Sequence, residues 1–424
     1  MSVKQAAHKA YLFLFKNTNL RQTVLKNAFW LFSSKVMGHA IRAIIVIYAA
    51  RVLGTAGFGT ASYALSFAGI FMIIADMGMG SVLTKEMIQN PDKRERYFAT
   101  AFSLRSLFAL ISFLAIAGIG PLITRIPEAV ALLPLAALTL IFDSMRNLAI
   151  AFIHAKEKME WEAGLMLFTN LMTVLIGVGI LTVYMTPAGM LYGYAIGSGI
   201  GFFAAFFALR GHIKKTVINF DRAIAIQLLK QSLPLVFMGL LGGTMLNIDA
   251  IMIGWWKGAV DVGLYAAAQK PIQIAYGFAL VAGGSLLPAL SRVAREDGAR
   301  FTSVLRQVMR PVIAVSAITS IICVIFAKEL LVLVYGAAYA PAAGTFIILA
   351  LTIAINAPII IGFNAIIAAG KQKIYLWSAP VEAISNIVLN TLFIPRFGIE
   401  GAALSTLITQ LVVNAYLWKK IREL

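Results

Sequence analysis

Residues 262–288, VGLYAAAQKPIQIAYGFALVAGGSLLP, form a long apolar run in which Lys270 is the only charged side chain. A helix that spans a lipid bilayer needs roughly 20 apolar residues at a rise of 1.5 Å each, so this run is long enough to cross. A charged side chain at the centre of a membrane helix costs about 2.5–3.5 kcal/mol on insertion scales. The stretch therefore predicts a transmembrane helix, and Lys270 is a candidate functional residue.

The composition of the whole chain agrees with a membrane protein. Of the 424 residues, 60% are hydrophobic and 13% are charged, and the mean hydropathy is +0.86, whereas a soluble domain typically carries about 25% charged residues. The single cysteine, Cys323, excludes an internal disulfide and a zinc cluster built on several thiolates. The four histidines lie far apart without metal-ligand spacing, so we expect no metal site and no cofactor.

Hydropathy divides the chain into about twelve helical spans. They are residues 28–50, 58–82, 98–119, 129–152, 163–184, 188–209, 233–255, 262–289, 308–327, 340–367, 374–394 and 399–418. We therefore expect an all-α integral membrane protein made of two six-helix lobes, 28–209 and 233–424. A cytoplasmic amphipathic segment, 1–27, precedes the first lobe, and a basic cytoplasmic linker, 210–232, joins the two.

The positions of the basic residues orient these spans. If the N-terminus lies in the cytoplasm, most of the 36 Lys and Arg residues fall in cytoplasmic segments, as the positive-inside rule requires. The outer loops then hold only Arg51, Arg125, Lys257, Lys328 and Arg396. The formal charge of +18 is explained by this topology and by contact with anionic lipid headgroups, without a nucleic-acid partner. We expect a multi-pass protein of the cell (inner) membrane with both termini in the cytoplasm.

The two predicted lobes share sequence features at corresponding positions. AFIHAKEKM, ending at Met159, precedes Asn170, and AIIAAGKQKI, ending at Ile374, precedes Asn386. A looser match joins GFGTASYA, residues 57–64, to VGLYAAA, residues 262–268. Two halves that both start on the same side of the membrane imply parallel repeats about an axis along the membrane normal, with the substrate site between them near the midplane.

Three stretches resemble one family of transporters. They are RVLGTAGFGTASYALSFAGIFMIIADMG (51–78), FIHAKEKMEWEA (152–163) and VDVGLYAAAQKPIQIAYGFALVAGGSLLPALSR (260–292). The chain is similar over most of its length to the polysaccharide exporters, the Wzx-type flippases of the multidrug/oligosaccharidyl-lipid/polysaccharide superfamily. The resemblance implies a MATE-like, two-lobed bundle around a central cavity that opens alternately to either side.

The same resemblance implies a substrate and partners. Members of the family move undecaprenyl-pyrophosphate-linked oligosaccharides from the inner to the outer leaflet, for O-antigen, capsule or exopolysaccharide synthesis. Membrane lipids and glycan polymerase machinery are the implied partners. The sister branch of the superfamily exports cationic compounds in exchange for Na⁺ or H⁺, so coupling to either ion is left open.

Several ionisable side chains lie inside the predicted spans, where a charge marks a candidate functional site. They are Lys35, Arg42, Asp76, Arg105, Asp143, Arg146, Asp249, Lys270 and Glu382. Lys35, His39 and Arg42 are four and then three residues apart, which places them on one face of the first helix. Because a cationic face against lipid is costly, we expect it to face water.

Arg42, Lys270 and Asp249 are predicted at a similar depth, ~12 Å from the same side of the membrane at helical rise. Fixed cations in a wet cavity can replace the hydration that a pyrophosphate loses, and arginine binds phosphate oxygens in a forked geometry. Alternatively, Lys270 pairs with Asp249, or the two roles alternate as substrate arrives. Pro271 removes a backbone donor and can kink the helix beside the ammonium group.

Other charges have structural explanations. Asp143 and Arg146 can pair along one helix, Arg105 can extend to the cytoplasmic surface, and Asp76 fits a cap or an interhelical partner. Glu382 has no obvious partner. The candidates for binding pyrophosphate or sugar are Lys35, His39, Arg42, Arg105, Arg146 and Lys270, and those for coupling or cavity acids are Asp76, Asp249 and Glu382.

Three functions are compatible with these features. A flippase for polyprenyl-pyrophosphate-linked glycans is favoured, because the clustered charges inside the spans are basic. A cation-coupled antiporter for drugs or metabolites is the alternative, with the acidic candidates as its pocket. A membrane-embedded polymerase or ligase is disfavoured, because the outer loops are short and contain no paired carboxylates and no nucleophile beside a base. We therefore expect a transporter and no enzyme.

Overall fold

The computed structural model describes residues 20–213, 220–296, 298–371 and 373–423, which are mostly helical and contain no β-strand. Most of the predicted N-terminal segment, residues 1–19, and the middle of the predicted linker, residues 214–219, lie outside them. The prediction of an all-α membrane protein is confirmed. Nine helices in the described ranges are long and apolar enough to cross a membrane, or ten if the bent helix 259–295 counts as one span.

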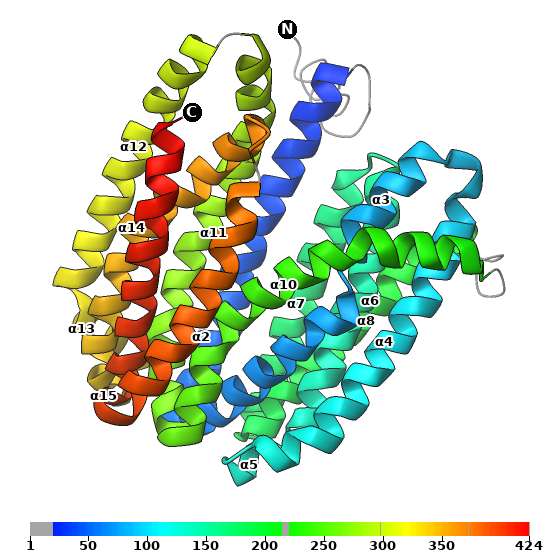
Figure 1. Cartoon of the computed structure of the whole chain (residues 1–424). Helices are drawn as coiled ribbons and strands as arrows, with labels where there is room; N and C mark the ends of the chain where they lie inside the picture. Colours follow the sequence, from blue (N-terminus) through cyan, green and yellow to red (C-terminus); the bar gives the residue numbers. More distant parts are fainter. Residues whose placement is uncertain (1–19, 214–219, 297, 372, 424) are drawn as a thin grey trace, which may run out of the picture.

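The helices are labelled in Figure 1. They are α2 (Leu20–Asp76), α3 (Met79–Gln89), η1 (Pro91–Lys93), α4 (Arg94–Ile123), α5 (Pro127–Val130), α6 (Leu133–Ala155), α7 (Met159–Val183), α8 (Pro187–Ala208), α9 (Arg210–Ile213), α10 (Arg222–Trp256), α11 (Ala259–Glu296), α12 (Gly298–Ile325), α13 (Ala327–Tyr335), η2 (Ala337–Ala342), α14 (Ala343–Ala368) and α15 (Lys373–Arg422).

Two of these helices are each interrupted at a glycine. The backbone of α2 leaves helical geometry at Gly54 (φ 66°), and that of α15 does so at Gly398 (φ 60°). Glycine adopts positive φ without the steric cost that a Cβ brings. Each long element therefore holds two of the predicted spans, joined by a bend in place of a loop.

The helices form two groups. Figure 1 shows α3 to α8 on the right and α11 to α15 on the left, and α10 crosses from the right-hand group to the left-hand one. Helix α2 packs against α4, α6, α7 and α8, so it is counted with the right-hand group, and it also contacts α11 of the left-hand group. The largest buried apolar cluster joins the groups, because it contains Ile45 and Phe58 of α2, Tyr265 of α11 and Phe346 of α14.

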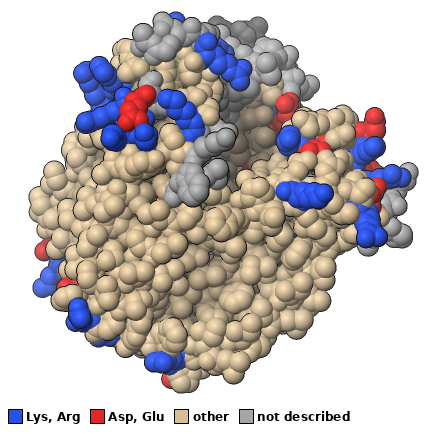
Figure 2. Space-filling view, in the orientation of Figure 1, with Lys and Arg blue, Asp and Glu red and all other residues tan. Residues whose placement is uncertain are grey.

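The described chain begins and ends at the same end of the bundle, here called the terminal end (Figure 1). Figure 2 shows Lys and Arg gathered at this end, above a broad band of uncharged surface, with fewer charges at the opposite, far end. An uncharged belt between charged ends is what a protein embedded in a bilayer requires, since charges are costly in hydrocarbon.

Helix α10 begins earlier than the sequence indicates, at Arg222 inside the predicted linker. The carboxylate of Asp221 caps it by accepting hydrogen bonds from the backbone nitrogens of Ala223 (2.9 Å) and Ile224 (3.2 Å). Ile224 and Leu228, four residues apart, are buried against the right-hand group. The basic residues of this stretch therefore belong in part to an amphipathic helix that docks on the protein, and the linker 210–232 stays a prediction.

The first turns of α10 are also held by a buried carboxylate. Glu86 of α3 is only 4% exposed, and it accepts hydrogen bonds from the side-chain amides of Gln227 (2.8 Å) and Gln231 (3.0 Å). Hydrogen bonds to a charged group are among the stronger ones in proteins. The beginning of α10 is therefore anchored in the right-hand group, although its end lies in the left-hand one.

At the far end, α2 and α11 cross with their backbones in contact. A Cβ on Gly59 would lie 1.8 Å from the carbonyl oxygen of Ala259, and a Cβ on Gly263 would lie 2.0 Å from that of Thr55. These glycines belong to the two loosely matching stretches, 57–64 and 262–268. The related segments therefore meet each other between the two groups.

Further contacts between the groups close the far end. The guanidinium group of Arg51 donates hydrogen bonds to the carbonyl oxygens of Leu333 and, at 2.8 Å, Val334, in the last turn of α13. The hydroxyl of Tyr339 donates to the carbonyl oxygen of Ala50 at 2.9 Å. A cation at a helix C-terminus also interacts favourably with the helix dipole.

We predict that Gly263→Ala lowers the melting temperature of the purified protein, because the new methyl group overlaps backbone atoms and overpacking costs about 1–3 kcal/mol. Gly284→Ala on the same helix is the matched control, since a Cβ there has no other atom within 4 Å. Equal melting temperatures for the two variants would contradict a tight crossing at Gly263.

Candidate functional site

A cavity of about 550 Å³ lies between the two groups of helices, beside the closed far end. Its wall combines α2, α6 and α8 with α10, α11 and α13. The charged residues and histidine that line it are His39, Arg42, Asp143 and Lys270, and its other polar residues include Ser62, Ser66, Thr139, Tyr194, Asn247 and Gln273.

Arg42 and Lys270 approach this cavity from different groups of helices. Arg42 lies on α2, and Lys270 lies on α11, where its ammonium group donates a hydrogen bond to Gln273 Oε1 at 3.3 Å. The Nε atom of Arg42 is buried and has no hydrogen-bond partner among the described residues. The structure thus brings together two cations whose donors are not used up by the protein, and their role in substrate binding stays a prediction.

The predicted basic face of the first helix is only partly at the cavity. His39 lines it, one turn from Arg42, and packs close to Gly277 of α11. Lys35 is exposed and is not among the lining residues; it lies one further turn toward the terminal end. The face therefore runs from the cavity toward the terminal end.

The alternative considered for Lys270, a pair with Asp249, is not formed. Asp249 is 1% exposed and lies within the left-hand group, away from the cavity lining. Its carboxylate accepts hydrogen bonds from the hydroxyl of Tyr265 at 2.5 Å and from the side-chain amide of Asn390 at 2.6 Å. Tyr265 and Lys270 are five residues apart on α11, roughly 140° around the helix, so they point in different directions.

A small polar cluster surrounds Asp249. The hydroxyl of Thr406 donates to its carboxylate at 3.1 Å, and Asn390 donates to Asn386 Oδ1 at 3.1 Å. The Oδ1 atom of Asn390 is buried without a hydrogen-bond partner among the described residues. The cluster draws on α10, α11 and both parts of α15, and its hydroxyl and amide groups donate hydrogen bonds to a buried carboxylate.

Arg105 does not reach a surface, and the prediction that it extends to the cytoplasmic side is wrong. It is fully buried and forms a salt bridge with Asp76 at 2.7 Å. It also donates hydrogen bonds to the carbonyl oxygens of Ser144 and Asp76, both at 2.9 Å. These contacts tie α2, α4 and α6 together outside the cavity, and they agree with the interhelical partner that was the favoured explanation of Asp76.

The other charged candidates occupy different settings. Asp143 and Arg146 form the predicted salt bridge along α6, at 2.7 Å, and of the two only Asp143 lines the cavity. Glu382 of α15 is half-buried and forms no ion pair with any side chain that the structure describes. Among the described residues, no three His, Cys, Asp or Glu side chains are grouped as a metal site would need.

The uncharged polar residues of the cavity wall are not apparent from the sequence. Ser62, Ser66, Thr139 and Asn247 do not interrupt a hydropathic span, so hydropathy alone does not mark them. Gln273 had a usable signal, because it follows Lys270 by three residues and therefore lies on the same face of α11.

The structure predicts different outcomes for two arginines of the membrane-spanning helices. Arg105→Gln removes the salt bridge to Asp76 and two hydrogen bonds to carbonyl oxygens from a fully buried side chain, so the melting temperature should fall strongly. Arg42→Gln removes no hydrogen bond or ion pair to the described part of the chain, so the melting temperature should change little. A larger loss of thermal stability in Arg42→Gln than in Arg105→Gln would reverse this assignment of roles.

Solved structures with the same fold include transporters of two kinds. The lipid II flippase MurJ in an inward closed conformation has a TM-score of 0.75 and 16% identity, over 92% of this chain and 87% of that one. A multidrug resistance MATE family transporter of the MOP superfamily, in an inward-facing conformation, has a TM-score of 0.71 and 12% identity, over 93% and 98%. The predicted MATE-like architecture is confirmed.

Sequence relatives point to glycan biosynthesis. The chain is 21% identical to the probable low-salt glycan biosynthesis flippase Agl15 of Haloferax volcanii, over 89% of this chain and 79% of that protein. It is 20% identical to the capsular polysaccharide biosynthesis protein CapF of Staphylococcus aureus, over 94% and 100%. The family model described as "Polysaccharide biosynthesis protein" matches residues 24–294. The chain belongs to this polysaccharide biosynthesis protein family.

Proposed function

We propose that the protein is a flippase for a polyprenyl-pyrophosphate-linked oligosaccharide and that Arg42 and Lys270 bind the pyrophosphate. The observation that carries the proposal is the position of these two cations, which reach one cavity from two different groups of helices. A pyrophosphate that enters the cavity can contact both groups at once, so its binding depends on how the groups are placed.

The chemistry of the cavity suits such a headgroup. Leaving water is costly for a phosphate anion, and fixed ammonium and guanidinium donors replace part of the lost hydration. The one carboxylate in the lining, Asp143, is paired with Arg146 at 2.7 Å, so it does not cancel the positive charge of Arg42 and Lys270. Hydroxyl and amide side chains such as Ser62, Ser66 and Asn247 can bind sugar hydroxyl groups.

The direction and partners of transport are part of the same proposal. With both termini in the cytoplasm, the substrate enters from the inner leaflet and leaves when the far end opens toward the outer leaflet. Undecaprenyl pyrophosphate is the proposed carrier, and the glycan belongs to a cell-surface polysaccharide. The names of Agl15, CapF and MurJ support a lipid-linked glycan as the substrate class. The protein rearranges no covalent bond in this scheme.

We propose further that Asp249 holds the coupling ion, H⁺ or Na⁺. A buried carboxylate is costly unless it carries a proton or lies next to a cation. The unpartnered Oδ1 atom of Asn390 and the hydroxyl of Thr406 supply neighbouring oxygen ligands. The site links α10 to α15 and is separate from the cavity, so ion binding can change helix packing without competing with the substrate.

A cation-coupled antiporter for drugs or metabolites is less well supported. Such a transporter needs uncompensated acidic groups in the cavity for a cationic substrate. The acidic lining residue, Asp143, is paired with Arg146, whereas Asp76 and Asp249 lie outside the cavity and are bound to Arg105 and Asn390. The same fold serves drug export in the MATE structures, so the distinction depends on the sign of the charge in the cavity.

The double variant Arg42→Gln/Lys270→Gln tests the binding site. Each hydrogen bond from a charged group contributes about 1.5–3 kcal/mol, so the affinity for undecaprenyl pyrophosphate should fall at least about tenfold per substitution. Binding to the purified protein and surface display of the glycan are the measurements. The matched control is Arg96→Gln/Lys230→Gln, which removes two exposed cations outside the cavity. Unchanged affinity in the first double variant would falsify the assignment.

Asp249→Asn tests the coupling site, because it keeps the shape of the side chain and removes its charge. We expect undecaprenyl pyrophosphate to bind with nearly unchanged affinity, while transport in proteoliposomes no longer responds to an imposed Na⁺ or H⁺ gradient. A gradient response equal to that of the wild type would show that the coupling ion binds at another site.

A further inference from the structure

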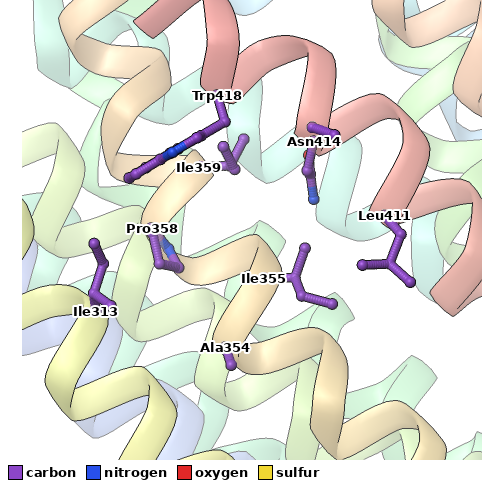
Figure 3. Close-up of a pocket in the computed structure, with 9 residues that line it drawn as sticks. Ile313, Ala354, Ile355, Pro358, Ile359, Leu411, Asn414 and Trp418 are labelled. Atoms are coloured by element: carbon purple, nitrogen blue, oxygen red, sulfur yellow. The ribbon is translucent and has the colours of Figure 1, made fainter. Parts of the chain in front are cut away.

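A second hollow, a crevice of about 300 Å³, lies on the left-hand group of helices. Figure 3 shows its lining: Ile313 of α12, Ala354, Ile355, Pro358 and Ile359 of α14, and Leu411, Asn414 and Trp418 of α15, with Ala415 completing it. α14 packs against both α12 and α15 and forms the floor, and the other two helices form the walls. None of these residues lines the cationic cavity.

The crevice is almost wholly apolar. Its one polar residue, Asn414, is 5% exposed and uses its amide group to donate to Asn356 Oδ1 at 3.4 Å. Ile313 and Leu411 on the walls are 39% and 47% exposed. A hydrocarbon chain fills such a crevice without leaving a polar group unpaired, and van der Waals packing holds it there, because a lipid tail gains no hydrophobic free energy on moving from the bilayer to the protein.

Cations flank the terminal end of the crevice. Arg310 precedes Ile313 by three residues on α12, and Arg422 follows Trp418 by four on α15, so each lies one turn beyond a lining residue on the same face. Arg310 is exposed, and the guanidinium carbon of Arg422 lies 5.6 Å from the centroid of the Trp418 ring. Lys371, just beyond α14, is exposed near the same end.

The depth of these residues matches a lipid headgroup. Arg310 and Trp418 lie at the limits of the predicted spans 308–327 and 399–418, and tryptophan is enriched at the membrane–water interface. The carboxylate of Glu423 also lies at this end, but it is paired with Lys420 at 2.7 Å. An excess of positive charge therefore lies at the terminal end of the apolar crevice, and it comes from Arg310, Lys371 and Arg422.

We propose that this crevice is a binding site for an anionic membrane phospholipid. One acyl chain lies on α14 between α12 and α15, and the phosphate binds Arg310 and Arg422. The terminal end of the crevice is positively charged and lies at the level of the lipid headgroups. The site therefore selects an anionic lipid over a zwitterionic one. The site is distinct from the proposed pyrophosphate site, and it does not depend on the transported substrate.

The test uses the fluorescence of Trp418 as the reporter. The full chain is reconstituted in phosphatidylcholine bilayers that contain increasing fractions of phosphatidylglycerol with brominated acyl chains, or of brominated phosphatidylcholine. The difference in quenching between the wild type and Trp418→Phe isolates Trp418 from the other tryptophans. We expect brominated phosphatidylglycerol to quench Trp418 at a lower fraction than brominated phosphatidylcholine.

Two substitutions locate the origin of that preference. A basic residue near the membrane surface contributes about 1 kcal/mol toward anionic lipid, a factor of about five. Arg310→Gln should therefore reduce the preference about fivefold while leaving Arg422 on Trp418, and Arg310→Gln/Arg422→Gln should abolish it. The matched control Arg96→Gln removes an exposed arginine of the right-hand group and should leave the preference intact.

A second pair of variants tests whether an acyl chain occupies the crevice. Ala415→Phe fills the crevice and should reduce quenching by both lipids, whereas Ala314→Phe, an exposed alanine outside the lining, should not. Equal quenching by the two headgroups in the wild type would overturn the proposal, as would a preference that survives in the double arginine variant. Relief of the quenching by equimolar undecaprenyl phosphate would also overturn it, because the site would then belong to a polyprenyl lipid.

Discussion

The backbone contact between α2 and α11 at Gly59 and Gly263 is the constraint around which the structure is arranged. No side chain separates the helices there, since a Cβ on either glycine would overlap a carbonyl oxygen of the other helix. The crossing joins the two groups of helices, and the hydrogen bonds of Arg51 and Tyr339 are added beside it. Because the far end is closed in this way, the space between the groups remains as a cavity lined by both.

The charges within the membrane region fall into two classes that differ in how they are stabilised. Arg105 is neutralised by Asp76 and donates to two carbonyl oxygens, so the protein satisfies it internally. Arg42 and Lys270 border the cavity and donate few hydrogen bonds to the described part of the protein. The charges of the first class hold helices together. Those of the second class leave hydrogen-bond donors for a molecule that enters the cavity. A count of intramembrane charges does not separate these classes, but their surroundings do.

Much of the fold follows from the sequence, because the length of each apolar run and the positions of Lys and Arg can be read directly along the chain. The common depth of Arg42 and Lys270 also follows, since helical rise converts residue number into distance. The direction in which a side chain points around its helix does not follow, because tertiary packing sets it. For this reason the pairing of Lys270 with Asp249 failed, and Arg105 was assigned to a surface. The start of α10 was missed because its basic residues resemble those of a loop, whereas Ile224 and Leu228 cover the apolar side.

Helix α10 is attached to both halves of the molecule. Its first turns are fastened to Glu86 through Gln227 and Gln231, and its last turns contain Asp249 with its partners on α15. Because this continuous helix is held at both ends, the halves can tilt against each other only if the helix bends between its two attachment points. Pro234, which lacks a backbone donor, and the neighbouring Gly239, Gly242 and Gly243 lie in that interval. The bending of this one helix therefore limits how far the two halves can move relative to each other.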